Sequence, residues 1–145
     1  MKTKNNTLRN IVFLGVGILL VLAVIVGTNL LTPKAQSAQI ALPMEVSVKK
    51  AAEMGAAGAF VLDVRQPEEW NQGHIEGATL IPLGDLSARL SELPIDQDIV
   101  VVCRSGNRSA QGRDILRNGG LSRSTSMSGG MNEWASQGYP LATGP

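Results

Sequence analysis

The 145-residue sequence has little of what many functional sites require: one cysteine, one histidine and, in total, two Trp, one Tyr and two Phe. A single cysteine excludes an internal disulfide, and it excludes the zinc and iron–sulfur sites that need several thiolates. Lys and Arg number 13 and Asp and Glu number 12, so no basic surplus marks a nucleic-acid-binding protein. No nucleic-acid partner, metal or organic cofactor is therefore indicated.

The near-neutral total hides two different parts of the chain. Residues 1–43 carry a net charge of +4 and no acid, whereas the remaining 102 residues carry −3. Ile11–Leu31 contains no charged residue, and a helix of that length matches a hydrocarbon core of about 30 Å. We therefore expect a tail at 1–10, a transmembrane helix in the lipid bilayer at 11–31 and a linker at 32–43.

The cations before the apolar segment place the short tail in the cytoplasm. The domain at 44–145 would then lie on the extracytoplasmic side of the cell membrane, in a single-pass protein. A cleaved signal peptide is the alternative, because Ala35-Gln36-Ser37 is a small-x-small tripeptide that signal peptidase accepts, with cleavage near Ser37. The apolar run exceeds the roughly 7–15 residues of most signal peptides, which favours an uncleaved signal anchor. Both alternatives export the domain.

From residue 44 onward, short apolar runs alternate with amphipathic stretches. Strands are expected at 45–48, 60–64, 78–81, 99–102 and, weakly, 124–127. Helices are expected at 49–54, 67–70, 85–93, 108–118 and 132–137. This alternation predicts an α/β domain whose parallel sheet is covered by helices on both faces.

Cys103 follows the strongest strand signal, Ile99–Val102, and begins a polar loop that leads into the helix at 108–118. Ligands of open α/β sheets bind at the carboxyl ends of strands. A helix that begins there directs backbone N–H groups and a partial positive charge at one place. Gly106 allows a tight curl, and residues 103–123 hold five arginines and one aspartate. The pattern predicts an anion-binding loop around the cysteine.

In this setting the Cys103 thiol is expected to be an activated nucleophile. A free thiol has a pKa of about 8.5, and a helix N-terminus or nearby arginines can lower it to about 3.5–7.5. The competing interpretation is an inert cysteine that packs as a small hydrophobic residue. Six hydrophilic or glycine residues follow Cys103, which favours a side chain at the exposed rim of the sheet.

A series of short motifs supports a family resemblance. The chain carries, in order, Asp63-Val64-Arg65, Pro67-Glu68-Glu69-Trp70, Gly73-His74-Ile75, Gly77-Ala78, Ile81-Pro82, the loop 103–109, Gly129-Gly130 and Trp134. With this order and spacing, residues 45–140 resemble the single-domain rhodanese (thiosulfate sulfurtransferase-like) family. The resemblance implies a rhodanese-like fold with a five-stranded parallel sheet. It also implies a cysteine that takes up a sulfane sulfur as a persulfide and passes it to a thiophilic acceptor, such as cyanide or a thiol.

The resemblance assigns roles to residues of this sequence. Cys103 would be the catalytic persulfide carrier. The residues that would bind a small anionic donor such as thiosulfate are Arg104, Ser105, Gly106, Asn107, Arg108 and Ser109. Asp63, Arg65 and Glu69 match structural positions, where Arg65 is expected to bond the carboxylates in a partly buried ion pair. His74 and the two tryptophans are expected in the core, and the glycine pair in a tight turn beside the loop.

Two features depart from the family pattern. Residues 122–126 (SRSTS) are polar where the family has an apolar strand, which predicts an exposed edge strand or a loosened region. Gly112 lies inside a predicted helix, where glycine costs about 1 kcal/mol relative to alanine unless close packing requires it.

Three other functions compete with sulfur transfer. Phosphatases and arsenate reductases of the same fold need an arginine six residues after the cysteine, where this chain has Ser109, and Arg108 comes one residue early. A persulfide relay for one protein partner, or a binding module with little turnover, remains an alternative. The cysteine in its predicted anion-binding loop favours the sulfurtransferase.

Overall fold

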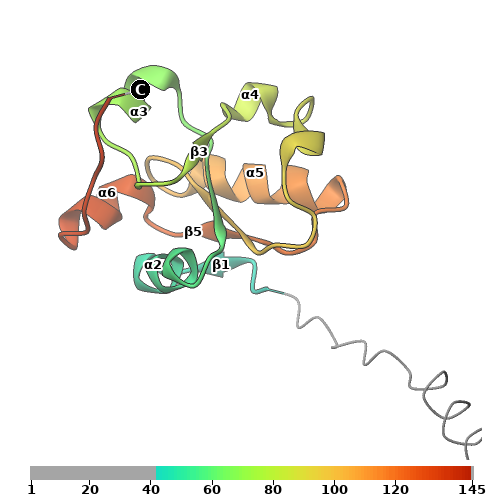
Figure 1. Ribbon diagram of the computed structural model, residues 1–145, viewed down its shortest axis with the longest axis horizontal. Helices are drawn as coiled ribbons and strands as arrows, with labels where there is room; N and C mark the ends of the chain where they lie inside the picture. Colours follow the sequence, from blue (N-terminus) through green and yellow to red (C-terminus); the bar gives the residue numbers. More distant parts are fainter. Residues whose placement is uncertain (1–41, 145) are drawn as a thin grey trace, which may run out of the picture. The chain divides into compact units, whose positions relative to one another are not determined.

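The computed structural model describes residues 42–144, which form a five-stranded parallel sheet with helices on both faces (Figure 1). The strands are β1 (Glu45–Val46), β2 (Phe60–Asp63), β3 (Thr79–Leu80), β4 (Ile99–Val102) and β5 (Ser124–Met127), in the spatial order β1-β5-β4-β2-β3. The helices are α2 (Val48–Ala56), α3 (Pro67–Gln72), α4 (Leu83–Leu86), α5 (Asn107–Asn118) and α6 (Gly130–Ser136), with a 3-10 turn at Leu90–Glu92. The predicted α/β class is confirmed.

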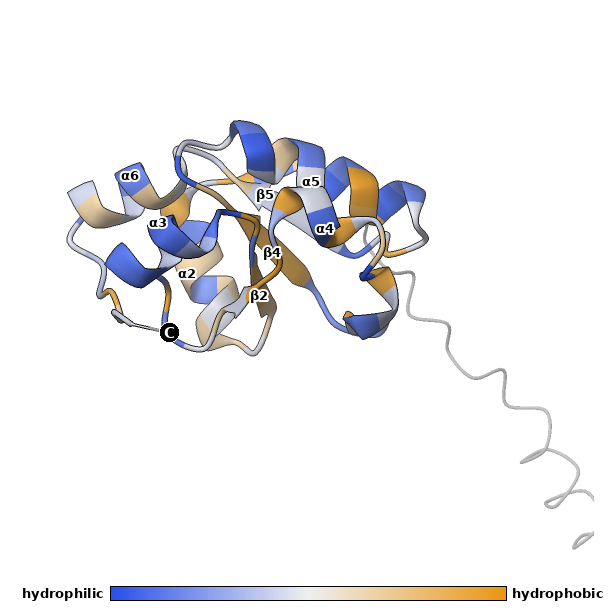
Figure 2. Cartoon of the chain, turned by 90° about the horizontal axis from the view of Figure 1, so that it is seen from above, coloured by the Kyte–Doolittle hydropathy of each residue, from blue (hydrophilic) through white to orange (hydrophobic). Residues whose placement is uncertain are grey.

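Strand β4 lies in the middle of the sheet and separates two apolar clusters. Val100 and Val102 pack with residues of α2 and α6 on one face, whereas Ile99 and Val101 pack with residues of α4 and α5 on the other. Figure 2 shows the apolar strands β2 and β4 between helices that carry both hydrophilic and hydrophobic residues. Burial on both faces explains why β4 is apolar at every position.

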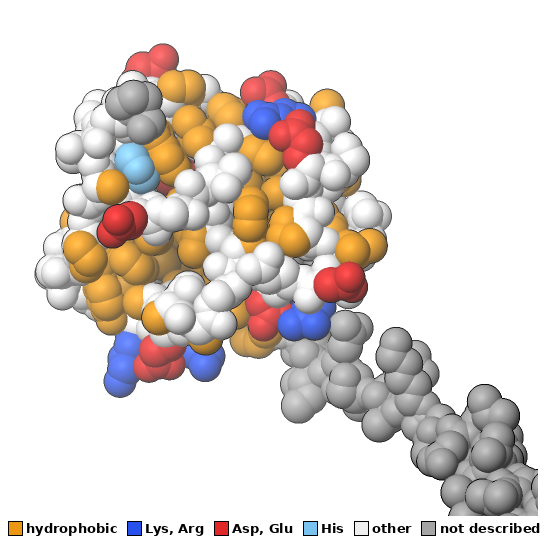
Figure 3. Space-filling view, in the orientation of Figure 1, with side chains coloured by type: hydrophobic (Ala, Val, Ile, Leu, Met, Phe, Trp, Pro, Cys, Tyr) orange, Lys and Arg blue, Asp and Glu red, His pale blue; other side chains and the backbone are white. Residues whose placement is uncertain are grey.

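An apolar hollow of about 370 Å³ lies on the face that carries α2. Small residues of α2, valines of β2 and β4, and Trp134 of α6 line it. Apolar side chains are visible across the face of the molecule shown in Figure 3. The lining residues place this hollow on the α2/α6 side of the sheet. Cys103 packs in the apolar cluster on the other side, with α4 and α5.

The predicted tail, the transmembrane helix at 11–31 and most of the linker lie outside the described residues. Within residues 42–144 no helix has the length and apolar character needed to cross a bilayer. The membrane assignment therefore stays a prediction from the sequence.

The expectation of an exposed or loosened last strand is wrong. β5 pairs with both β1 and β4, and all four of its residues are buried. Arginines of α5 satisfy part of its polar surface: Arg113 donates to the Ser126 hydroxyl at 2.9 Å, and Arg117 donates to the Ser124 carbonyl. A polar strand is thus buried because a neighbouring helix supplies donors.

The single helix expected at 85–93 is also wrong, because α4 and the 3-10 turn are separate pieces. Leu93 is extended, with φ −95° and ψ 147°, as expected before Pro94. Close packing explains the glycine inside α5. A Cβ on Gly112 would lie 3.1 Å from a Val101 methyl and 3.4 Å from a Val64 methyl. Glycine therefore lets α5 pack close against the sheet.

Candidate active site

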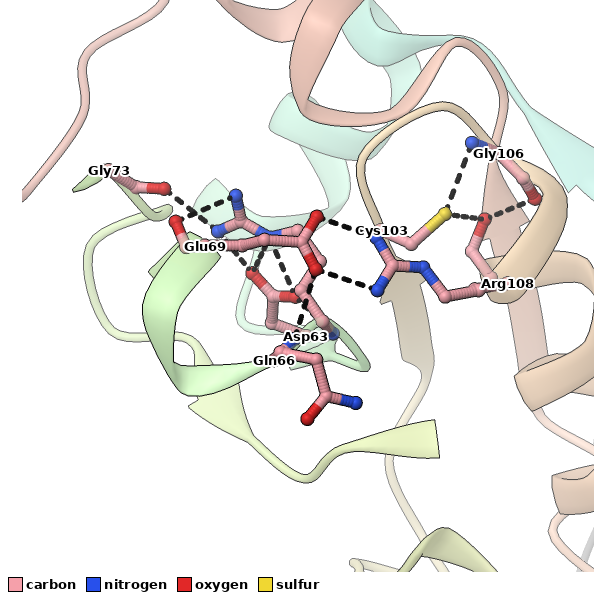
Figure 4. Close-up of polar contacts among 9 residues, drawn as sticks. Asp63, Gln66, Glu69, Gly73, Cys103, Gly106 and Arg108 are labelled. Atoms are coloured by element: carbon pink, nitrogen blue, oxygen red, sulfur yellow. Dashed lines mark hydrogen bonds and ion pairs between the residues drawn. The ribbon is translucent and has the colours of Figure 1, made fainter. Parts of the chain in front are cut away.

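Cys103 lies where β4 ends and the loop to α5 begins. The Gly106 N–H donates to its Sγ at 3.1 Å, and Sγ lies 3.6 Å from the Ser109 hydroxyl (Figure 4). The residue is only 1% exposed, so the expected exposed rim position is wrong. Gly106 adopts φ +103°, which curls the loop over the sulfur; the polar residues that follow Cys103 enclose it instead of exposing it.

The first turn of α6 fixes the orientation of the loop. The Met131 N–H donates to the Cys103 carbonyl at 2.8 Å, and the Asn132 N–H donates to the Arg104 carbonyl at 3.0 Å. Because the C=O and N–H of a trans peptide point in opposite directions, the Ser105 amide that follows the second carbonyl is free to act on the sulfur. The structure thus aims amide dipoles at the sulfur.

The glycine turn before α6 makes this contact possible. Gly129 and Gly130 adopt φ +68° and +59°, respectively. A Cβ on Gly130 would lie 2.6 Å from the Arg104 carbonyl oxygen. The expected tight turn beside the loop is therefore present, and it brings two backbone segments together more closely than any side chain would permit.

Ser109 connects the sulfur to the loop backbone. Its buried hydroxyl donates to the Gly106 carbonyl at 2.7 Å. Burial raises the pKa of the Cys103 thiol, but its hydrogen bond with the Ser109 side chain and the hydrogen bonds from the amides of Ser109, Ser105 and Gly106 outweigh it. The net result is a thiol pKa below its usual range, so an anionic sulfur is stabilised chiefly by hydrogen bonds.

The five arginines of 103–123 do not form one cationic patch at the loop. Arg113 pairs with Asp114, Arg123 pairs with Asp98, and Arg117 donates to the carbonyls of Leu42 and Ser124. These three arginines hold the sheet and the segment before β1 together. The arginines that outnumber the single aspartate of residues 103–123 are thus mostly structural.

The two remaining arginines of that stretch have different roles. Arg104 is exposed, and its side chain makes no ion pair or hydrogen bond within residues 42–144. Arg108 donates from both terminal nitrogens to the Glu69 carboxylate, each at 2.7 Å. The Arg108 hydrogen bonds lower the pKa of Glu69 from 4.5 to about 2, so this carboxylate is ionised at neutral pH.

Glu69 was expected to bond Arg65, but its carboxylate bonds Arg108. Arg65 instead holds Asp63 through a buried ion pair at 2.7 Å, and it donates to the carbonyls of Glu69 and Gly73. This network fixes the end of β2 against α3 and so positions Glu69. No local motif links two residues 39 positions apart; only the packing of α3 beside the loop brings them together.

The other expected core residues occupy the core. His74 stacks on Trp70 with ring centroids 3.7 Å apart, and its Nδ1 lies 3.2 Å from the Trp70 carbonyl oxygen. Trp134 is buried, and its indole N–H donates to the Pro140 carbonyl. These contacts give all three side chains a structural role.

A hollow of about 520 Å³ lies beside the active loop. Its polar lining includes Arg104, Glu69 and Asn132, and its apolar lining includes Met131 and Leu141. Its lining residues come from the end of β2, the loop, the α3 region, α6 and the C-terminal segment. It is large enough for a small anion together with an organic group.

Residues 47–137 match the family model of the rhodanese-like domain. The chain belongs to this family. This rhodanese-like protein is 40% identical over 82 residues to a sulfurtransferase of Allochromatium vinosum, covering 57% of this chain and 77% of the relative. It is 34% identical over 98 residues to thiosulfate sulfurtransferase GlpE of Pseudomonas entomophila, covering 68% and 89%, respectively.

Other comparisons bear on the domain and its fold. A crystal structure of a rhodanese-related protein from Thermoplasma volcanium is similar with a TM-score of 0.66 and 30% identity, covering 70% of this chain and 100% of that one. The chain spans only 21% of the probable adenylyltransferase/sulfurtransferase MoeZ of Mycobacterium tuberculosis, at 38% identity. Together the comparisons support sulfur transfer for the family.

Proposed function

We propose that this domain is a sulfurtransferase that carries a sulfane sulfur as a persulfide on Cys103. The observation that carries the proposal is the sulfur at the end of β4, 3.1 Å from the Gly106 N–H and beside the Ser109 hydroxyl. Amides directed at one sulfur stabilise the anion both before and after it accepts a second sulfur. The similarity to proteins named sulfurtransferases supports the same chemistry.

Thiosulfate is the proposed donor, and the reaction balances without an added oxidant or reductant. The Cys103 thiolate attacks the outer sulfur of thiosulfate, the S–S bond of the donor breaks, and sulfite leaves with the bonding electron pair. The resulting persulfide anion is then attacked at its terminal sulfur by cyanide or a thiolate, which regenerates the Cys103 thiolate. No proton is needed in either transfer when both nucleophiles are anionic.

The residues of the active loop have separate roles in this reaction. The amides of Ser105, Gly106 and Ser109 stabilise the sulfur, and Arg104 at the rim of the hollow attracts the anionic donor. Asn107 begins α5 and is exposed at its first turn. Arg104→Gln is therefore expected to raise the KM for thiosulfate while leaving the free energy of unfolding nearly unchanged.

Intact-mass spectrometry after thiosulfate treatment tests the proposal. We expect wild type to gain the mass of one sulfur atom and Cys103→Ala to gain nothing, since the chain has one cysteine. A stable persulfide with slow release to cyanide would indicate a relay that serves a protein acceptor. Absence of any gain in folded wild type would contradict the sulfurtransferase and leave the binding module as the function.

Residues 11–31 are proposed to anchor the domain on the extracytoplasmic side of the cell membrane. The support is the uncharged run of 21 residues with cations before it. Carbonate extraction of cell membranes followed by intact-mass measurement tests both alternatives. Full-length protein in the membrane fraction supports the anchor, whereas a soluble product that begins near residue 38 supports cleavage near Ser37.

A further inference from the structure

The ion pair between Arg108 and Glu69 joins the active loop to α3, and sulfur transfer alone does not explain it. Both nitrogens of the guanidinium fork donate to the carboxylate. Figure 4 shows the guanidinium turned toward Glu69 and not toward the Cys103 sulfur. A cation of the active loop is thus bound by a carboxylate of the protein itself.

The other charges near the loop make this pairing consequential. Arg65 is buried and neutralised by Asp63. Arg104 makes no ion pair among the residues that the structure describes. Within residues 42–144, an incoming anion therefore meets one free guanidinium beside the loop, and a second becomes available only if Arg108 leaves Glu69.

We propose that Glu69 is a positioning residue that holds Arg108 away from incoming reagents and so makes the site discriminate against negative charge. The Arg108 and Glu69 side chains are 30% and 26% exposed, so a dissolved anion can reach the pair, and Glu69 also lines the adjoining hollow. Each anion must compete with Glu69 for Arg108, whereas a neutral reagent meets no such competition. For sulfur donors, the inference rests on the proposed function. For alkylating reagents that the Cys103 thiolate attacks, it does not.

Alkylation of the full-length chain by iodoacetate and by iodoacetamide measures this discrimination directly. The two reagents transfer similar groups and differ by one negative charge, and the single cysteine makes every thiol adduct a Cys103 adduct. In Glu69→Gln the ratio of the iodoacetate rate to the iodoacetamide rate is expected to rise roughly three- to ten-fold, which is the effect of one unit charge at several ångströms in a solvated site. Salt at 0.5 M should reduce the rise, since the pair is partly exposed.

Glutamine is a suitable replacement because it preserves the capping role of Glu69. The Glu69 carboxylate accepts from the Gln66 N–H at 3.2 Å, and glutamine accepts the same bond at the third helical position. Glu92→Gln is the matched control. It removes the same charge from another bidentate pair, in which Arg89 donates at 2.8 and 2.7 Å, and it should leave the ratio unchanged.

A second background separates the position of Arg108 from the electric field of Glu69. In Arg108→Gln, adding Glu69→Gln should raise the ratio less than it does in the wild-type background, because only the field of the carboxylate is removed and no guanidinium is released. An equal rise in that background would overturn the proposal, and so would an unchanged ratio in Glu69→Gln alone.

A comparison of two sulfur donors tests the inference in an assay that depends on sulfur transfer. Glu69→Gln should raise kcat/KM for thiosulfate, a dianion, relative to methanethiosulfonate, a monoanion, by a similar factor. A shift in the alkylation ratio without persulfide formation by wild type would refute the proposed function and support the role of Glu69. Persulfide formation with an unaltered alkylation ratio would support the proposed function and refute the role of Glu69. If neither reagent alkylated the folded chain, Cys103 would be sealed, and both would fail.

Discussion

Replacing Ser109 with alanine should raise the pKa of the Cys103 thiol. Burial raises that pKa, and among the interactions that lower it the hydrogen bond of the Ser109 side chain is the largest. Alanine removes this bond while the sulfur stays buried, so the effect of burial is less opposed. A hydrogen bond to a charged group contributes about 1.5–3 kcal/mol, and the 3.6 Å separation of Sγ and Oγ places this one at the low end. The expected rise is therefore about one pKa unit.

The pH dependence of iodoacetamide alkylation measures the shift. In Ser109→Ala the midpoint should move upward by about one unit, and the rate below the midpoint should fall roughly ten-fold, since only the thiolate reacts. Ser136→Ala removes an exposed hydroxyl on α6 and should leave the midpoint where it is. A folded Ser109→Ala variant with an unchanged or lower midpoint would refute the idea that this hydroxyl stabilises the anionic sulfur.

The Thr125 hydroxyl is buried without a hydrogen-bond partner among the described residues, so Thr125→Val should raise the free energy of unfolding in urea by about 1–2 kcal/mol. Ser126→Ala should lower it, because that hydroxyl is bonded. Gly130→Ala should destabilise the domain by roughly 2–4 kcal/mol in the same assay, through a positive φ and a backbone clash. The pKa of Glu69 falls from 4.5 to about 2 in the folded domain. Its ion pair therefore stabilises the fold fully above pH 4.5, and this stabilisation is lost as the pH falls toward 2. In Arg108→Gln the melting temperature should change less with pH across that range.

Local patterns predicted the centre of the fold well. Ile99–Val102 was expected as a strand and is β4 with the same bounds, because four consecutive apolar, β-branched residues fit a strand that is buried on both faces. The helix expected at 108–118 begins one residue earlier, at Asn107. The position of Cys103 between them followed directly, since strand and helix boundaries are set by nearby residues.

Features that depend on distant contacts were not predictable in the same way. β5 has a polar sequence, and its burial depends on Arg113 and Arg117, which reach it from α5. The burial of Cys103 depends on a loop that is held by α6, through the Met131 amide. In both cases a polar sequence suggested exposure, but hydrogen-bond partners remote in the chain allow the polar groups to be buried.

The same reasoning changes how the charge of the active loop is interpreted. Counting arginines in the sequence suggested that full charges hold the sulfur as an anion. The hydrogen bonds that lower the thiol pKa are instead those with the Ser109 side chain and with backbone amides, while Arg108 is held by Glu69. Fixed dipoles stabilise a buried anion without having to reorganise when charge develops. Guanidinium groups at the entrance would then govern which reagents arrive, and the amides would govern how reactive the sulfur is, so the two properties can change independently.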